Sequence, residues 1–554
     1  MSRLSTHTAS WLSTTFAPLS NRPFRNIWAA GTASNLGSVI QATSAAWLMT
    51  TMTTSPVLIA LVQTAATIPL VLCALPAGAA ADLYNKRLQM LFGNVLSLAA
   101  IILLVVLTVQ DEITPYRLLA LTGIASVGLT VMLPAWHASV IEMVTRADLA
   151  ASVSLNSLGF NIARAVGPAI GAEIIAIAGI AAAFSANAVS YLFMIAALLV
   201  WRYKPIRKTL PQESIGRAMV DGLRFVGLSP GLRLHIARGF LLTFTASALL
   251  ALPPVVALEL DVGARGFGIL LTAFGVGAMV GSLSVASVRL HMQPKRQLLF
   301  AMLCLAVSSI ALAASPNLFF AAFSLLIGGF GWIQSASTLQ VTVQTACPRW
   351  VTARTISIFS TTFALGIASG AALWGLLAAE FGMTTALIGS GMVTAGAAIF
   401  SSLVHFYDPN EDDLQPRFEL DSYRAPQVDP RSGPVWLTVE YRVPKANVTQ
   451  FRSAMRDYAR IRRRDGARNW SLAQDIDSRD IWIERFQSPT WADFLHRISR
   501  MLVADNVTRE RILALCEDKP VWRRQLERSG RARELSDGRD EDEGEVGSFF
   551  RSMT

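Results

Sequence analysis

The sequence predicts an all-α polytopic membrane protein of twelve transmembrane helices in two six-helix repeats, followed by a soluble α+β domain. Two charge-free runs support this prediction most strongly: 56 residues from Asn26 to Ala81 and 52 residues from Gln297 to Pro348. A spanning helix needs about 20 consecutive apolar residues, and a charge at the bilayer centre costs several kcal/mol. Each run is therefore long enough for two spans with a turn between them.

Shorter charge-free windows fill the rest of the first 407 residues, and each is long enough for one span. These windows are Leu88–Val109, Leu118–Ile141, Ile174–Trp201, Gly239–Leu258, Gly266–Val288, Thr355–Ala379 and Phe381–Tyr407. A helix from about Leu149 to Ala178, which carries two charges, completes the expected twelve.

The distribution of charge predicts the orientation in the membrane. Residues 1–407 contain 22 Lys and Arg against 11 Asp and Glu, so the net charge of +10 belongs to this part. With the N-terminus inside, 19 of the 22 cations lie on the cytoplasmic side, and only Arg117 and Arg265 lie outside. Cytoplasmic loops of membrane proteins carry such an excess of cations. We therefore expect both termini in the cytoplasm, in the inner membrane.

Other classes of protein fit the composition poorly. The cations are spread over short loops and form no basic domain, which argues against nucleic-acid binding. The N-terminus shows no cleavable signal, so the first span is expected to direct insertion. The four cysteines have no CxxC spacing, and we expect free thiols, no metal and no cofactor.

Two landmarks indicate an internal duplication. Gly78 ends the second span and Gly281 ends the eighth, 203 residues later, and a basic loop follows each of them. The turn at 145–149 recurs at 347–351, with an offset of 202 residues. A parallel repeat of six helices places a substrate cavity at the midplane between the halves, and rocking of the halves alternates access to it.

The loop Gly78…Asp82…Lys86-Arg87 resembles the signature loop of the major facilitator superfamily, with Leu83 and Asn85 departing from the usual pattern. The stretch 151–171 resembles the fifth helix of the branch that contains enterobactin-type siderophore exporters and drug efflux proteins. The resemblance covers about the first 407 residues. It implies secondary active export of a small molecule, siderophore-like or drug-like, driven by protons.

The signature loop is expected to act as a conformational gate formed by Gly78, Asp82, Lys86 and Arg87. A cytoplasmic Asp82 can accept hydrogen bonds from a helix N-terminus and pair with an arginine, for which Arg354 is the proposed partner. Such a lock holds only while the cytoplasmic side is closed. The alternative is that these charges merely mark the topology of the loop.

Only two charges inside the spans need an explanation. Arg164 lies near mid-span, where it can meet an anionic substrate or bond neighbouring carbonyls. Glu173 lies close to the outer end, where it can carry protons or simply contact water. Amides in the spans can line a cavity or tie helices together. The amides proposed for the transport site are Gln41, Gln63, Asn156, Asn161 and Gln334.

The composition changes abruptly after residue 407, because the last 147 residues carry 53 charges. We expect six parts: 1–201 and 234–407 as the two halves, 202–233 and 408–434 as linkers, 435–529 as a soluble domain and 530–554 as a disordered tail. The soluble domain shows a β-α-β-β-α-β order, which is a ferredoxin-like unit. It is similar to the dimeric barrels of antibiotic-biosynthesis monooxygenases.

We expect no catalytic residue in this domain, although Asn469, Trp470, Trp482 and His496 are the residues to test for one. A regulatory or dimerising role fits better, since a fold does not confer a function. The alternatives to an exporter are a membrane-anchored monooxygenase-like enzyme and an uptake transporter. An ATP-driven pump would need a phosphate-binding loop, and the chain contains no Gly-Lys dipeptide.

Overall fold

A computed structural model describes residues 17–145, 148–201, 215–348, 351–407, 414, 428–429, 431–499 and 501–527. The chain divides into two compact units. The larger one comprises Met1–Pro211, His235–Thr342 and Ser357–Phe406, and the smaller one comprises Gln212–Leu234, Val343–Ile356 and Tyr407–Thr554. The finer domain boundaries expected from composition stay predictions.

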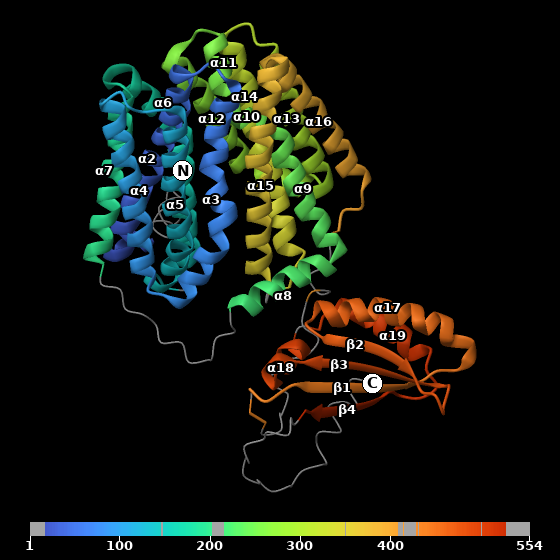
Figure 1. The fold of residues 1–554 in the computed structure, drawn as a ribbon. Helices are drawn as coiled ribbons and strands as arrows, with labels where there is room; N and C mark the ends of the chain where they lie inside the picture. The colour runs from blue at the N-terminus through green and yellow to red at the C-terminus, as the bar shows by residue number, and fades with distance from the viewer. Residues whose placement is uncertain are drawn as a thin grey trace, which may run out of the picture. The chain divides into compact units, whose positions relative to one another are not determined.

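The larger unit is a bundle of long helices that run side by side (Figure 1). The first half contains η1 (Ala17–Ser20), α2 (Arg22–Met52), α3 (Pro56–Leu83), α4 (Lys86–Val109), α5 (Pro115–Met143), α6 (Leu149–Ala178) and α7 (Ile180–Val200). The second half is formed by α9 (Pro230–Ala246), α10 (Ala248–Ala251), α11 (Pro253–Glu259), α12 (Gly263–His291), α13 (Pro294–Ala313), α14 (Leu318–Thr345), α15 (Thr352–Phe381) and α16 (Met383–Leu403).

Ten helices in the described part of the chain are long and apolar enough to cross a membrane. They are α3 to α7 and α12 to α16. Two further segments complete the expected twelve. Helix α2 has 31 residues but is rich in Ser, Thr, Asn and Gln, and the segment from α9 to α11 is interrupted near Pro253 and Pro254. Proline lacks a backbone N–H and breaks a continuing helix, which explains the interruption. The predicted fold class is thus confirmed.

The structure extends the evidence for the duplication. Gly179 is the single residue between α6 and α7, and Gly382 is the single residue between α15 and α16; the two positions are again 203 residues apart. Both have positive φ, +82° and +85°, a conformation that favours glycine. An added Cβ at Gly128 would overlap the carbonyl oxygen of Gly93, and one at Gly331 would approach the Ala301 oxygen to 2.7 Å. Both repeats therefore pack their third and fourth spans closely.

The smaller unit contains α8 (Ile215–Leu228) and a sheet domain. Its elements are β1 (Val435–Arg442), η4 (Lys445–Asn447), α17 (Val448–Arg464), β2 (Arg468–Gln474), β3 (Ile481–Ser488), α18 (Trp491–Ser499), η5 (Val503–Asp505), α19 (Asn506–Ala514) and β4 (Val521–Leu526). The sheet is antiparallel with the order β2-β3-β1-β4, and α17 and α19 cover one face (Figure 1). This topology confirms the predicted ferredoxin-like unit.

The alternation of residues along β1 explains why only one face of this sheet is covered. Leu437, Val439 and Tyr441 are buried, and they pack against Phe451 of α17 and Phe486 of β3. The residues between them on β1 are partly exposed. Since successive side chains of a strand point to opposite faces, one face of the sheet forms the core of the domain.

Candidate functional site

A cavity of about 190 Å3 lies between helices of both halves. Its walls come from α2, α3, α5 and α7 of the first half and from α10 and α11 of the second. Two predicted amides, Gln41 and Gln63, line it together with Tyr191, while Ile59 and Leu250 contribute apolar surface. A mostly apolar pocket with a few polar groups is typical of sites for small organic molecules.

Gln41 is held in position by the last helix of its half. Asn187 Nδ2 on α7 donates to Gln41 Oε1 at 2.6 Å, and Ser190 Oγ donates to Asn187 Oδ1 at 3.0 Å. Gly37 permits this approach, because an added Cβ would overlap both Ser190 and Asn187. Gln63 donates to Thr67 Oγ1 of its own helix at 3.3 Å. The prediction that amides line a cavity therefore has a structural counterpart at these two positions.

The other predicted amides lie elsewhere. Gln334 on α14 is buried and donates to the Gly281 carbonyl at 3.1 Å and to Ser284 Oγ at 2.9 Å, and it accepts from Gln297 Nε2 at 2.8 Å. These bonds tie three helices of the second half together. Asn156 and Asn161 are half-buried on α6 and do not line the cavity.

Arg164 lies on α6, where the two halves approach each other. Its guanidinium stacks over the Phe160 ring at 5.7 Å from the centroid. An added Cβ at Gly275 on α12 would overlap the Arg164 carbonyl oxygen, and one at Gly268 would overlap Ala172. Small residues thus bring α6 and α12 into backbone contact, as in other membrane helix pairs.

Glu173 has a partner that the sequence did not suggest. Arg265, in the first turn of α12, donates from Nε to Glu173 Oε2 at 3.0 Å and from Nη2 to Oε1 at 2.9 Å. The two side chains are 50% and 64% exposed for Glu173 and Arg265 respectively. This bidentate pair joins the first half to the second at the helix ends that the charge distribution assigns to the outside.

A second contact between the halves involves α3 and α15. Thr64 Oγ1 donates to the Ala368 carbonyl at 2.9 Å, and an added Cβ at Gly375 would overlap Ala60. These residues lie near the N-terminus of α3 and in the C-terminal half of α15. Both regions belong to the same expected outer side as the pair of Glu173 and Arg265.

The residues of the predicted gate are only partly described. Arg87 donates to the last-turn carbonyls of α7, from Nε to Leu198 at 2.7 Å and from Nη2 to Leu199 at 2.8 Å. A cation at a helix C-terminus is favourable because carbonyls there lack partners. The side chain of Asp82 lies outside the described residues, so its pairing with Arg354 stays a prediction.

Two other members of the gate are described more fully. Lys86 is the first residue of α4, which begins where Asn85 caps the amides of Arg87 and Leu88. In the described part of the chain, an added Cβ at Gly78 meets no atom within 4 Å.

The smaller unit has a cavity of its own, of about 300 Å3, between α8 and α17. Phe225 and Leu228 line it from α8, and Arg460, Ile461 and Arg464 line it from α17. The side chain of His496 lies outside the described residues. Trp470 Nε1 donates to Glu484 Oε1 at 2.8 Å, and Trp482 belongs to the core.

Residues 13–530 match the transmembrane secretion effector family. This match covers more than half of the chain. The chain belongs to that family.

Relatives of this chain are named as transporters. The chain is 26% identical over 354 residues to the multidrug efflux pump Tap of Mycolicibacterium fortuitum, covering 61% of this chain and 84% of Tap. It is 27% identical over 282 residues to the enterobactin exporter EntS of Salmonella typhi, covering 49% of this chain and 65% of EntS. The chain therefore spans just under two thirds of the length of EntS.

Solved structures of transporters have a fold similar to that of this chain. A POT family transporter in complex with a thioalcohol-conjugated peptide superposes with a TM-score of 0.54 at 13% identity, covering 67% of this chain and 94% of that one. A bacterial homologue of the human lysosomal transporter Spinster, inward-facing and unoccupied, gives 0.54 at 12% identity, covering 69% and 94%. The solved structures show the fold, and together with the family match they identify the protein as a multi-pass membrane transporter of the major facilitator fold.

Proposed function

We propose that this protein exports a small amphipathic molecule, siderophore-like or drug-like, from the cytoplasm by proton-driven alternating access. The observation that carries the proposal is the cavity of about 190 Å3 between the two halves, in a chain of the transmembrane secretion effector family. The relatives Tap and EntS are named as an efflux pump and an exporter. The distribution of cations supports an orientation with both termini inside.

The contacts between the halves support a conformer that is closed on the outer side. Thr64 bonds Ala368, Glu173 bonds Arg265, and Gly268 and Gly275 bring α12 against α6. In an alternating-access cycle these contacts must break before cargo leaves. Glu173 then acts as half of an outer latch, and its protonation would remove the charge that Arg265 bonds. This is how we propose that the acid participates in coupling.

The polar groups predicted to take part in transport have separate proposed roles. Gln41 and Gln63 would hydrogen-bond cargo, and Arg164 would favour anionic cargo, since a guanidinium binds carboxylates in a bidentate fashion. Asn156 and Asn161 lie on the same helix as Arg164 and would support it. Gln334 would fix the second half rather than bind cargo.

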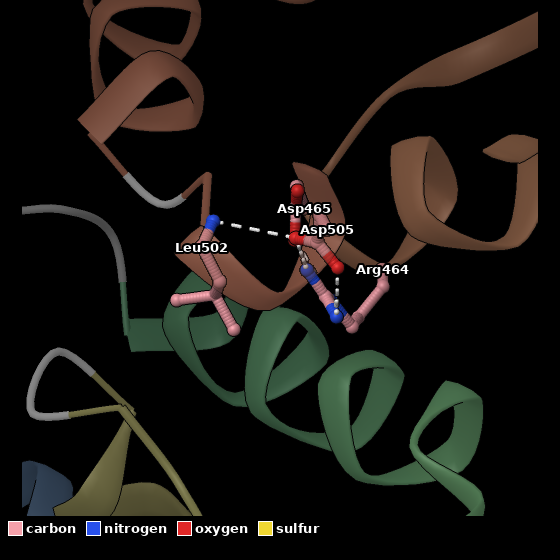
Figure 2. Close-up of polar contacts among 4 residues, drawn as sticks. All are labelled: Arg464, Asp465, Leu502 and Asp505. Atoms are coloured by element: carbon pink, nitrogen blue, oxygen red, sulfur yellow. Dashed lines mark hydrogen bonds and ion pairs between the residues drawn. The ribbon is translucent and has the colours of Figure 1, made fainter. Parts of the chain in front are cut away.

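The sheet domain is proposed to regulate transport through α8, the helix in the connection between the two halves. Figure 2 shows Arg464 beside Asp465 and Asp505; the bonds to Asp505 measure 3.2 Å from Nη1 and 2.6 Å from Nη2. The same guanidinium stacks over Phe225 of α8 at 5.5 Å. Because two carboxylates hold Arg464 in place, α17 offers α8 a preformed contact.

A dimerising role is the second candidate for this domain. The sheet face opposite the helices carries the Trp436 ring, over which Arg485 stacks at 4.2 Å. Self-association of the purified protein that disappears in Trp436→Ala would favour this role over regulation through α8.

Transport into everted membrane vesicles tests the proposed export. Vesicles that contain the protein should accumulate ethidium or a catecholate siderophore when respiration energises them, and an uncoupler should abolish accumulation at constant ATP. Gln63→Ala, in the cavity, should raise the KM for cargo, whereas Gln110→Ala, at the exposed end of α4, should not. Accumulation that resists the uncoupler, or vesicles that lose cargo instead, would refute proton-driven export.

A further inference from the structure

The interior of the sheet domain contains an unusual group of buried charges. Arg462 of α17 and Arg497 of α18 are 3% and 4% exposed, and Glu484 of β3 is fully buried with them. Both guanidinia lie over the ring of Phe486, at 4.7 Å for Arg462 and 4.4 Å for Arg497. Charged side chains are almost never fully buried unless they are paired, so the partners of these groups matter.

The carboxylate of Glu484 is already fully used. Glu484 Oε2 accepts from the Tyr441 hydroxyl at 2.8 Å, and Oε1 accepts from Trp470 Nε1 at 2.8 Å and from Arg462 Nε at 3.2 Å. Three donors therefore converge on it. Glu484 pairs with Arg462 and, like Asp465, acts on Arg497 through its charge, although no hydrogen bond joins it to Arg497 among the described side chains.

The neighbouring acids are used as well. Asp465 and Asp505 both bond Arg464 (Figure 2), and Asp465 is buried. The half-buried Arg509 lies near Arg462, and Glu510 is the acid beside it. Within the described residues, Arg462 and Arg464 form ion pairs with Glu484 and these aspartates, whereas Arg497 forms none.

Several buried donors in this layer have no acceptor within the described ranges. They are Arg462 Nη2, Arg497 Nε, Arg509 Nη2 and Trp482 Nε1. A buried donor without a partner costs about 1–3 kcal/mol, and more when the group is charged. Burial, reinforced by the like charge of Arg462, lowers the pKa of Arg497 to about 9. Both observations describe buried cationic donors that a bound anion would satisfy.

We propose that this layer binds a small organic carboxylate between Arg462 and Arg497. A carboxylate would place a negative charge beside Arg497 and accept from the unpartnered donors of the two guanidinia, whose planar forks match its geometry. The surrounding rings of Phe486, Phe494 and Tyr458 exclude water. Such surroundings favour a carboxylate on an aromatic body over a strongly hydrated phosphate. This site lies apart from the transport cavity and does not depend on the direction of transport.

Hydrogen exchange on the full-length protein in detergent tests the proposal with three probes: benzoate, its neutral analogue benzamide, and inorganic phosphate. Benzoate at about ten times its dissociation constant should slow exchange of the β3 and α18 amides about tenfold, through linkage. Benzamide should have no effect, because it carries no charge. Protection by phosphate equal to that by benzoate would overturn the assignment to an organic carboxylate.

Two variants locate the site. Arg497→Met keeps the apolar volume and should abolish benzoate protection, whereas Arg485→Met, on the opposite face of the sheet, should leave it unchanged. Protection that survives Arg497→Met, or that benzamide reproduces in the unmodified protein, would refute the site. The comparison of benzoate with benzamide needs no variant, so the test stands even if Arg497→Met fails to fold.

Discussion

Glu173 and Arg265 join the two halves through an interaction that is weak by nature. Their hydrogen bonds are short, at 2.9 Å and 3.0 Å, but both side chains are at least half exposed. Solvent screens exposed ion pairs, so their contribution to stability is small. A small contribution suits a latch that opens in every cycle, because a strong bond would trap one conformer.

Removing this latch should open the outer side more often. We expect Glu173→Gln to speed labelling of Ala46→Cys, which lines the cavity, by an impermeant maleimide in a cysteine-free background. The increase should be roughly twofold to fivefold, as for the loss of one exposed ion pair. The charge swap Glu173→Arg with Arg265→Glu should restore the original rate.

Glu112→Gln is the matched control, because Glu112 pairs with Arg117 within one half at 3.7 Å. An equal increase in this control, or no increase in Glu173→Gln, would count against the latch.

The helices show which parts of the fold follow from local sequence. Span lengths and the βαββαβ order could be predicted because each depends on composition or periodicity within one segment. The break of the seventh span at α10 and α11 was not predicted, although Pro253 and Pro254 were a signal for it. The bond between Glu173 and Arg265 links residues 92 positions apart, and no periodicity reports such a pair. The role of Gln334 could not be predicted either. A glutamine that lines a cavity and one that hydrogen-bonds neighbouring helices look the same in the sequence.

The close packing of α6 against α12 predicts that one added methyl group, in Gly275→Ala, destabilises the protein. Gly275→Ala would place a Cβ against the Arg164 carbonyl oxygen. The two helices would have to move apart to remove this overlap. Overpacking of this kind costs about 1–3 kcal/mol. We expect a lower Tm and faster labelling of the cavity from outside.

Gly396→Ala on α16 serves as the control for that change. An added Cβ there meets no atom within 4 Å in the described residues. Alanine favours a helix over glycine by about 1 kcal/mol, so this variant should be as stable as the unmodified protein or slightly more so. Equal effects of the two substitutions would show that α6 and α12 are not closely packed in the membrane.

The whole molecule combines a duplicated helical bundle with a soluble domain attached to its C-terminal end. The repeat appears in the offsets of Gly179 and Gly382 and of Gly128 and Gly331, so the halves are equivalent six-helix bodies. Equivalent halves around one cavity are the physical basis of rocking. The function of the sheet domain could not be predicted from its fold, because a ferredoxin-like sheet serves many activities. The carboxylate site proposed for it depends on particular side chains such as Arg497.

Distance measurements between spin labels on the two halves test alternating access most directly. One pair, at Thr53 and Ser315, reports the expected outer side, and a second pair, at Tyr84 and Gln293, reports the inner side. When pH is lowered and transported cargo is added, the outer distance should grow while the inner distance shrinks. Distances that stay fixed, or that change in the same direction under conditions of active transport, would contradict the account.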